Sequence, residues 1–205
     1  MENKELNEKE SLELITRMIQ NSKKNLELGS GNIFLLWGYL SLVMSVVVLL
    51  LVWQTGDMRW NWVWFAIPVL GYPIQIYLVK KENKLVRTYT DKVIKAVWEI
   101  VSIAMSVTAI AFCMDVDTVQ FILPLMVAFA GIGVAITGEI INEGWIRNIG
   151  SMSFIIAVFS VTNAFSIGLW YYHTIVFIVC IVLVFIIPGY RLNREARRLQ
   201  KKEVE

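Results

Sequence analysis

The sequence predicts an all-α, polytopic membrane protein with six transmembrane helices arranged as three hairpins. Three observations lead to this fold class: 57% of the 205 residues are hydrophobic, the mean hydropathy is +0.59, and the apolar residues form long blocks between charged stretches. Soluble domains spread their apolar residues periodically, whereas a helix that crosses a bilayer needs about 20 consecutive apolar residues. Blocks of this kind therefore predict membrane spans.

Six blocks have the length that a span requires. They cover residues 33–53, 60–79, 93–114, 119–141, 146–168 and 171–188. Only a tight turn separates the last two, so one long buried hairpin is the alternative there. The chain thus divides into an N-terminal segment (1–32), a transmembrane domain (33–190) and a basic C-terminal tail (191–205).

The basic residues predict the orientation of these spans. With six spans, Arg59 is the only one of the 19 Lys and Arg residues that falls on the side away from the termini. Cytoplasmic loops carry an excess of Lys and Arg, so both termini are expected in the cytoplasm. The outer loops are too short to hold a receptor domain, and a soluble protein partner would therefore bind on the cytoplasmic side.

Catalytic and metal-binding motifs are not apparent, and we expect neither an enzyme nor a cofactor. Cys113 and Cys180 are the only cysteines and His173 is the only histidine, which argues against a disulfide framework or a Cys/His metal centre. Glu143 and Arg147 have the Glu-x-x-x-Arg spacing of one class of intramembrane proteases. Those enzymes also need histidines on later helices, and His173, expected near the outer face, cannot supply them alone.

One ionisable residue is expected within the third span. Glu99 lies about 10 Å along a helix from Lys92, where a carboxylate is costly unless it is paired, protonated or hydrated. Glu99, Ser102 and Ser106 follow nearly one stripe and could form a proton or cation site. The alternative, which we favour, is that Lys95 pairs with Glu99 one turn away and both reach toward the inner interface.

Small residues in the fourth span predict close helix packing, because lipid provides no hydrophobic drive between helices. The candidates are Gly131, Gly133, Ala135 and Gly138. A flexible or unwound substrate site is the alternative interpretation.

Prolines predict a kink in the second span, where Pro68 and Pro73 flank Gly71. Gln75 is expected to bond a carbonyl that a proline leaves free. Broken helices occur in transport pathways, but prolines are also common in inert membrane helices.

Aromatic residues suggest two further arrangements. Trp60, Trp62 and Trp64 could form a cage for a cation, but a spacing of two residues places them on different helix faces. The segment from Trp37 to Val46 aligns with that from Trp98 to Val107, which would make the hairpins internal repeats.

Both tails carry an apolar stripe on a charged helix. The stripes are Leu12, Ile15, Ile19 and Leu26 in the N-terminal segment, and Leu192, Ala196 and Leu199 in the C-terminal tail. Such helices lie on membrane lipid, with the basic tail favouring anionic lipid, or pack on each other within or between subunits of a homo-oligomer. We do not expect nucleic acid as a partner, because the basic residues adjoin a membrane exit, as the orientation rule already requires.

Four segments spread over the chain carry a resemblance. They are residues 29–38 (GSGNIFLLWG), 88–92 (TYTDK), 136–138 (ITG) and 187–189 (IPG), the last followed by Leu192 and Asn193. They resemble an uncharacterised family of small six-span bacterial integral membrane proteins with no assigned activity. The resemblance implies a bacterial cytoplasmic membrane and supplies no catalytic or binding residues.

The sequence thus leaves two functions open. The leading expectation is that the bundle binds or passes a small solute or ion. The alternative is a non-transporting membrane protein whose tails recruit or regulate a cytoplasmic partner.

Overall fold

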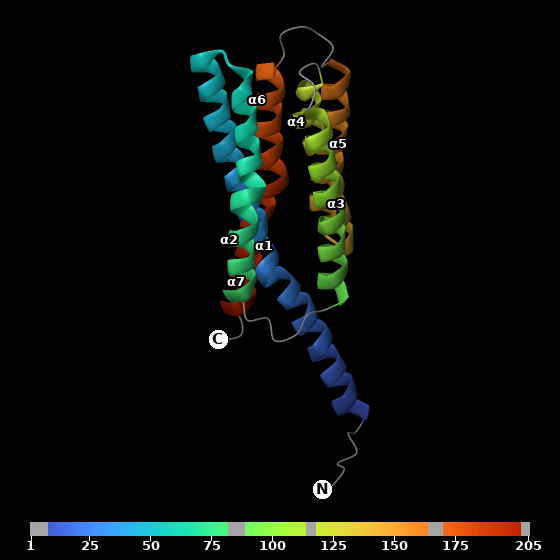
Figure 1. Ribbon diagram of the computed structural model, residues 1–205. Coiled ribbons are helices and arrows are strands. Elements are labelled where there is room, and N and C mark those ends of the chain that lie inside the picture. Colours follow the sequence, from blue (N-terminus) through green and yellow to red (C-terminus); the bar gives the residue numbers. More distant parts are fainter. Residues whose placement is uncertain (1–7, 82–88, 114–117, 164–169, 202–205) are drawn as a thin grey trace.

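The computed structural model describes residues 8–81, 89–113, 118–163 and 170–201, and the structured segments among them are all helical (Figure 1). The α-helices are α1 (Glu8–Thr55), α2 (Ala66–Lys81), α3 (Tyr89–Cys113), α4 (Ile122–Ile140), α5 (Gly144–Asn163), α6 (Trp170–Ile181) and α7 (Ile187–Lys201). Two 3₁₀ helices, η1 (Met58–Phe65) and η2 (Val119–Phe121), precede α2 and α4, and a π-helical turn, η3 (Val182–Ile186), joins α6 to α7.

Six stretches of the described chain are long and apolar enough to cross a membrane, as the sequence predicted. They are Gly31–Thr55, Met58–Lys80, Lys92–Cys113, Ile122–Ile140, Gly144–Thr162 and Tyr171–Arg194. The predicted fifth span extended to residue 168, but residues 164–168 lie outside the described part of the chain. The sixth continues beyond Pro188, because the π-helical turn accommodates the proline: the N–H of Ile187 reaches back five residues to the carbonyl of Val182.

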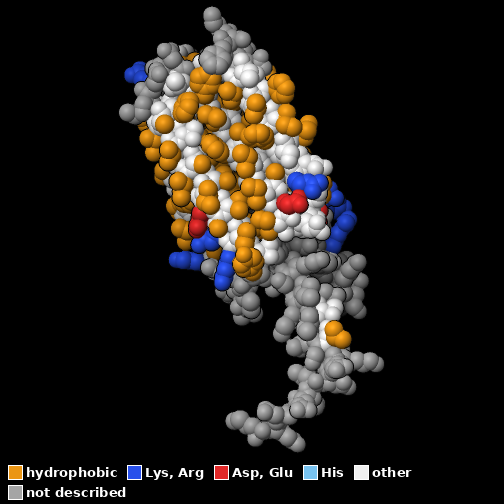
Figure 2. Space-filling model, turned by 90° about the vertical axis from the view of Figure 1, so that its right-hand side faces the viewer, with side chains coloured by type: hydrophobic (Ala, Val, Ile, Leu, Met, Phe, Trp, Pro, Cys, Tyr) orange, Lys and Arg blue, Asp and Glu red, His pale blue; other side chains and the backbone are white. Residues whose placement is uncertain are grey.

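The six spans run alternately up and down, with α6, η3 and α7 forming one continuous span, and α1 begins at the same end of the bundle at which α7 ends (Figure 1). One group comprises α1, α2, α6 and α7, and the other comprises α3, α4 and α5. The first half of α1 projects beyond the bundle, and we call this part, Glu8–Ser30, the arm. On the side that faces right in Figure 1, hydrophobic side chains cover most of the bundle (Figure 2).

Glycines allow α4 and α5 to pack with their backbones in contact. A Cβ atom at Gly131 would lie 2.7 Å from the carbonyl oxygen of Gly150, and one at Gly138 would overlap the backbone nitrogen of Arg147. Ala135 presents its backbone to Gly150 in the same way. Gly133 instead faces the ring of Trp98 on α3. The small residues of α4 thus lie at helix–helix contacts, and α4 is the most buried of the six spans.

Two tryptophans anchor successive helices by the same contact. Trp37 on α1 donates its indole N–H to Gln75 Oε1 on α2 at 2.9 Å, and its ring lies against Gly71. Trp98 on α3 donates to Thr137 Oγ1 on α4 at 3.2 Å and lies against Gly133, four residues before Thr137. Gln75 therefore accepts the indole N–H of Trp37, whereas its expected bond to a carbonyl freed by a proline stays a prediction.

The prolines of the second span occupy different positions in α2. Pro68 lies in the first turn of α2, directly after η1, whereas Pro73 lies inside the helix. Gly71, between them, is buried beneath Trp37. Its small size thus serves the contact between α1 and α2.

An aromatic cluster joins the two helix groups. Phe34 of α1, Trp98 of α3 and Phe185 of η3 have ring centroids 5.7 to 5.8 Å apart in each pair. Such edge-on and tilted contacts stabilise the junction beyond the area that they bury.

The start of the first span and α7 cross closely at the end where the termini lie. A Cβ atom at Gly31 would overlap the Asn193 side chain, and one at Gly189 would lie 3.0 Å from the carbonyl oxygen of Gly31. Asn193 also donates its side-chain N–H to Asn32 Oδ1 at 2.8 Å. Two of the segments that carry the family resemblance, far apart in the sequence, therefore meet here.

Candidate functional site

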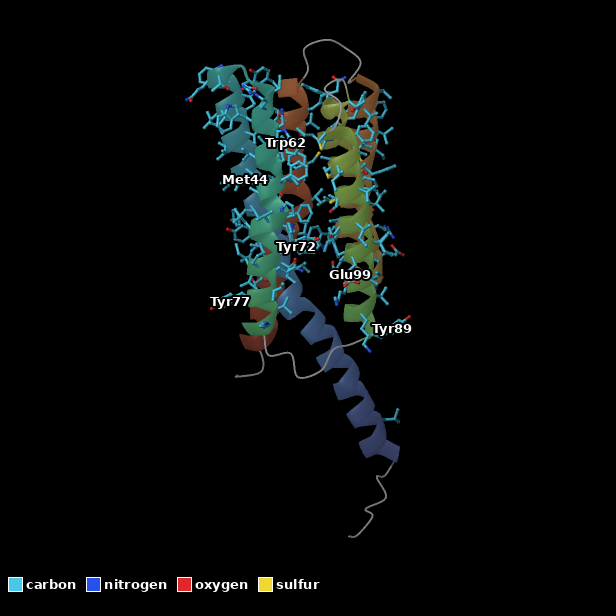
Figure 3. The ribbon with its side chains drawn as sticks, viewed as in Figure 1. Met44, Trp62, Tyr72, Tyr77, Tyr89 and Glu99 are labelled. Carbon is cyan, nitrogen blue, oxygen red and sulfur yellow. The ribbon has the colours of Figure 1, made fainter. Side chains whose placement is uncertain are left out.

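The charged pair of the third span lies on the outward face of α3. Lys95 Nζ and Glu99 Oε1 are 3.2 Å apart, and their side chains are 69% and 60% exposed; Glu99 is labelled in Figure 3. Ser102 donates to the Trp98 carbonyl at 2.6 Å, and Ser106 donates to the Ser102 carbonyl at 2.8 Å. These interactions all stay within α3; Lys95, Glu99 and Ser106 are exposed at the surface of the bundle, and Ser102 is half-buried.

The interior holds a small set of polar side chains. Those buried in the described part of the chain are Ser41, Ser45, Thr137, Ser153, Ser160, His173 and Thr174. Ser45 and Thr137 bond carbonyls of their own helices, as hydroxyls commonly do. Among the described Asp, Glu, Lys, Arg and His side chains, His173 alone is buried, which makes it the principal candidate for a functional residue.

His173 is held by a serine from the neighbouring helix. Ser160 Oγ on α5 lies 2.8 Å from His173 Nδ1 on α6, and the two residues are 1% and 2% exposed. Ser160 stands three residues before the end of α5, and His173 stands three residues after the start of α6. The pair therefore lies about one helical turn inside the end of the bundle opposite the arm.

The second imidazole nitrogen of His173, Nε2, is buried and has no hydrogen-bond partner among the residues that the structure describes. If Ser160 donates to Nδ1, Nε2 carries the proton and lacks an acceptor; in the other tautomer, Nε2 has a lone pair and lacks a donor. A buried polar group without a partner costs about 1–3 kcal/mol. The arrangement can therefore bind a small ligand that offers an acceptor, a donor or a cation to this nitrogen.

The geometry fits binding better than covalent catalysis. A serine–histidine pair that attacks a substrate needs a third group to orient the histidine through its other nitrogen. Among the described residues, none bonds Nε2 in this way. The described residues also contain no cluster of three His, Cys, Asp or Glu side chains that could hold a metal ion.

The Glu143 and Arg147 spacing has a structural role. Glu143 Oε2 accepts the indole N–H of Trp145 at 2.8 Å. Arg147 instead pairs with Glu139 at 3.0 Å across the turn between α4 and α5. These contacts secure the turn.

The three tryptophans of η1 do not converge into a cage. Trp64 packs its ring on Phe177 of α6, with centroids 5.2 Å apart, whereas Trp62 is exposed (Figure 3). An open hollow of about 560 Å³ beside Trp62 is lined by Asp57, Arg59, Trp60, Trp62 and Val63. Arg59 donates hydrogen bonds to the Asp57 carboxylate and holds the pKa of that carboxyl below its usual value. The carboxylate of this hollow is therefore already paired with a cationic side chain of the protein.

The Ser160–His173 pair was not predicted, because the boundary expected between residues 168 and 171 placed Ser160 and His173 at different distances from the turn. In the structure α5 ends at Asn163 and α6 begins at Trp170, so each residue stands three residues inside its helix and the two lie at the same depth. A lone histidine near a span end gave no reason to search for its partner.

No family model matches the chain, and no curated protein or solved structure matches it. The family resemblance noted above therefore stays a prediction, and the ligand of this chain must be inferred from its own residues.

Proposed function

We propose that this multi-pass membrane protein binds a small solute or ion inside its helix bundle, at the Ser160–His173 pair, and that this binding is a step in the passage of the solute. The observation that carries the proposal is the buried Nε2 of His173, which has no hydrogen-bond partner among the described residues. Ionisable side chains within transmembrane segments are rare and commonly mark a pathway or a ligand, and His173 lies in the sixth span, two residues from its start. In this pair Nδ1 of His173 bonds Ser160, and Nε2 is the atom that can bond such a ligand.

We further propose a bacterial cytoplasmic membrane, with both termini in the cytoplasm. This orientation is supported by the basic residues of the described loops and tails, such as Lys80, Arg147, Arg191 and Arg194, which lie toward the end of the bundle where α7 ends. In that orientation the Ser160–His173 pair lies near the outer surface. A solute would reach it from outside.

Access to the pair tests this proposal. In a background with Cys113→Ala and Cys180→Ala, Ser160→Cys places a nearly isosteric thiol beside His173 and leaves the histidine in place. Ser153→Cys, two turns along the same face of α5 and equally buried, is the matched control. A charged, membrane-impermeant methanethiosulfonate is added to right-side-out and inside-out vesicles, and labelling is measured by mass spectrometry.

We expect Ser160→Cys to react from the outer side and Ser153→Cys to stay unlabelled from either side. The physical reason is that a charged reagent reaches a thiol only through water, and the proposal places water at the first position only. Full protection of both thiols, with complete labelling after denaturation, would mean that the pair is dry and would overturn the proposal.

A second function has one observation in its favour. The arm continues the first span as unbroken helix, and at 1.5 Å per residue it reaches about 35 Å beyond the bundle. A rigid projection of this length is suited to binding a cytoplasmic partner. If that is the protein's role, removal of residues 1–28 will abolish function while ligand binding at His173 persists.

A further inference from the structure

The outward face of α3 has the spacing of a helix–helix seam, and none of the other helices that the structure describes covers it. The inner face contacts α4 and the aromatic cluster through residues such as Trp98, Val101 and Met105. On the opposite side, Ala96, Glu99, Ile103, Ser106, Ile110 and Cys113 recur at intervals of three and four residues. Of these, all but the half-buried Cys113 are exposed. This is the heptad spacing by which two helices pack along their length.

The polar residues of this seam distinguish it from an ordinary lipid-facing surface. Glu99 lies two turns inside its span, and of the described acidic residues it is the one placed this deep. Glu139, by comparison, lies one residue from the end of its span. A carboxylate within a span is costly unless it is paired, and Lys95 is its partner inside the chain, so a second cation from a neighbouring molecule would stabilise Glu99 further.

We infer that the α3 seam binds the α3 seam of a second copy of this chain, forming a parallel two-fold dimer. In a parallel two-fold dimer each seam residue faces its own copy, so the two Glu99 carboxylates lie opposite each other and each Lys95, one turn away, lies within reach of both. The two lysines and the two glutamates then balance in charge. Ala96 and Ser106 are small, which lets the two helix backbones approach closely. Close packing matters here because lipid provides no hydrophobic driving force between helices. The partner thus gives the buried carboxylates two lysines in place of one.

The native cysteine provides the test. Cys113 lies one heptad beyond Ser106 in the seam, so the two Cys113 thiols of the dimer face each other, whereas Cys180 is buried in the bundle. Copper-phenanthroline oxidation of membranes that contain the Cys180→Ala protein is expected to give a covalent dimer on a non-reducing gel. Cys113→Ala should abolish the dimer, and adding Ser106→Cys to that variant should restore it. Ile76→Cys, equally exposed but on α2, should not.

Charge variants then distinguish a specific dimer from cross-links that form by random collision in the membrane. Lys95→Glu and Glu99→Lys each place like charges across the seam, and each alone should cross-link about tenfold less than the parent. Co-expressed with different tags, the two variants should cross-link to each other as well as the parent does. All these side chains are exposed in the single chain, so the fold is retained. The inference is overturned if neither Cys113 nor Ser106→Cys cross-links, or if the mixed pair cross-links no better than each variant alone.

Discussion

Gly150→Ala is expected to destabilise the bundle by about 3 kcal/mol, at the upper end of the range for overpacked cores. The added Cβ would overlap the backbone nitrogen of Ala135 and would lie 2.6 Å from the carbonyl oxygen of Gly131. Backbone atoms cannot rotate away as a side chain can, so α4 and α5 would have to separate. Because this is the most extensive helix contact in the described chain, the whole bundle should lose stability.

Gly144→Ala, on the same helix, is the matched control. Its Cβ would meet only one atom within 4 Å, the Nη2 of Arg147 at 3.9 Å. Since alanine is favoured over glycine in a helix by up to about 1 kcal/mol, this variant should be neutral or slightly more stable. Unfolding by sodium dodecyl sulfate in mixed micelles measures both free energies. Equal stabilities of the two variants would contradict the close packing of α4 and α5.

The second large effect concerns the Ser160–His173 pair. Ser160→Ala leaves His173 with two buried nitrogens that lack partners among the described residues, and should lower the free energy of unfolding by about 1–3 kcal/mol relative to the parent. Ser160→Ala combined with His173→Leu removes the polar groups altogether. That double variant is expected to be as stable as the parent or more stable, since apolar replacement of both partners removes the desolvation cost.

The pattern of the four proteins decides between function and structure. His173→Leu alone should cost little, because Ser160 can bond a carbonyl of its own helix. A double variant more stable than the parent means that the pair is kept for its ligand at the expense of stability. If the double variant is instead as unstable as Ser160→Ala alone, the pair holds α5 and α6 together and the functional proposal loses its main support.

The spans were predictable because their signal is local. About 20 apolar residues in succession indicate a membrane helix whatever surrounds them. The glycines of α4 likewise indicate a close helix contact by their small size alone. The 3₁₀ character of η1 and the π-helical turn at Val182–Ile186 were not predicted, since both depend on how the neighbouring helices pack.

The face that each span turns inward was not predictable in the same way. Val101 is buried and Ile103 is exposed, yet both are apolar β-branched residues in the same helix. In a membrane protein the lipid-facing and the buried faces are equally apolar, so composition does not distinguish them. For this reason the sequence suggested that Glu99 could face the bundle, whereas its side chain lies on the outside.

The single histidine allows the most direct test of the central claim, that Nε2 of His173 meets a ligand or water inside the bundle. Protein labelled with ¹⁵N-histidine and purified without a histidine tag gives only two imidazole signals, one for each nitrogen. The spectra are recorded in lipid nanodiscs, with monovalent and divalent cations and small amino acids added in turn. We predict that the Nε2 proton exchanges with water and that its signal shifts with at least one of these probes, while Nδ1 keeps the signature of its bond to Ser160. An Nε2 signal that neither exchanges with water nor responds to any probe would contradict the account and leave His173 a buried structural residue.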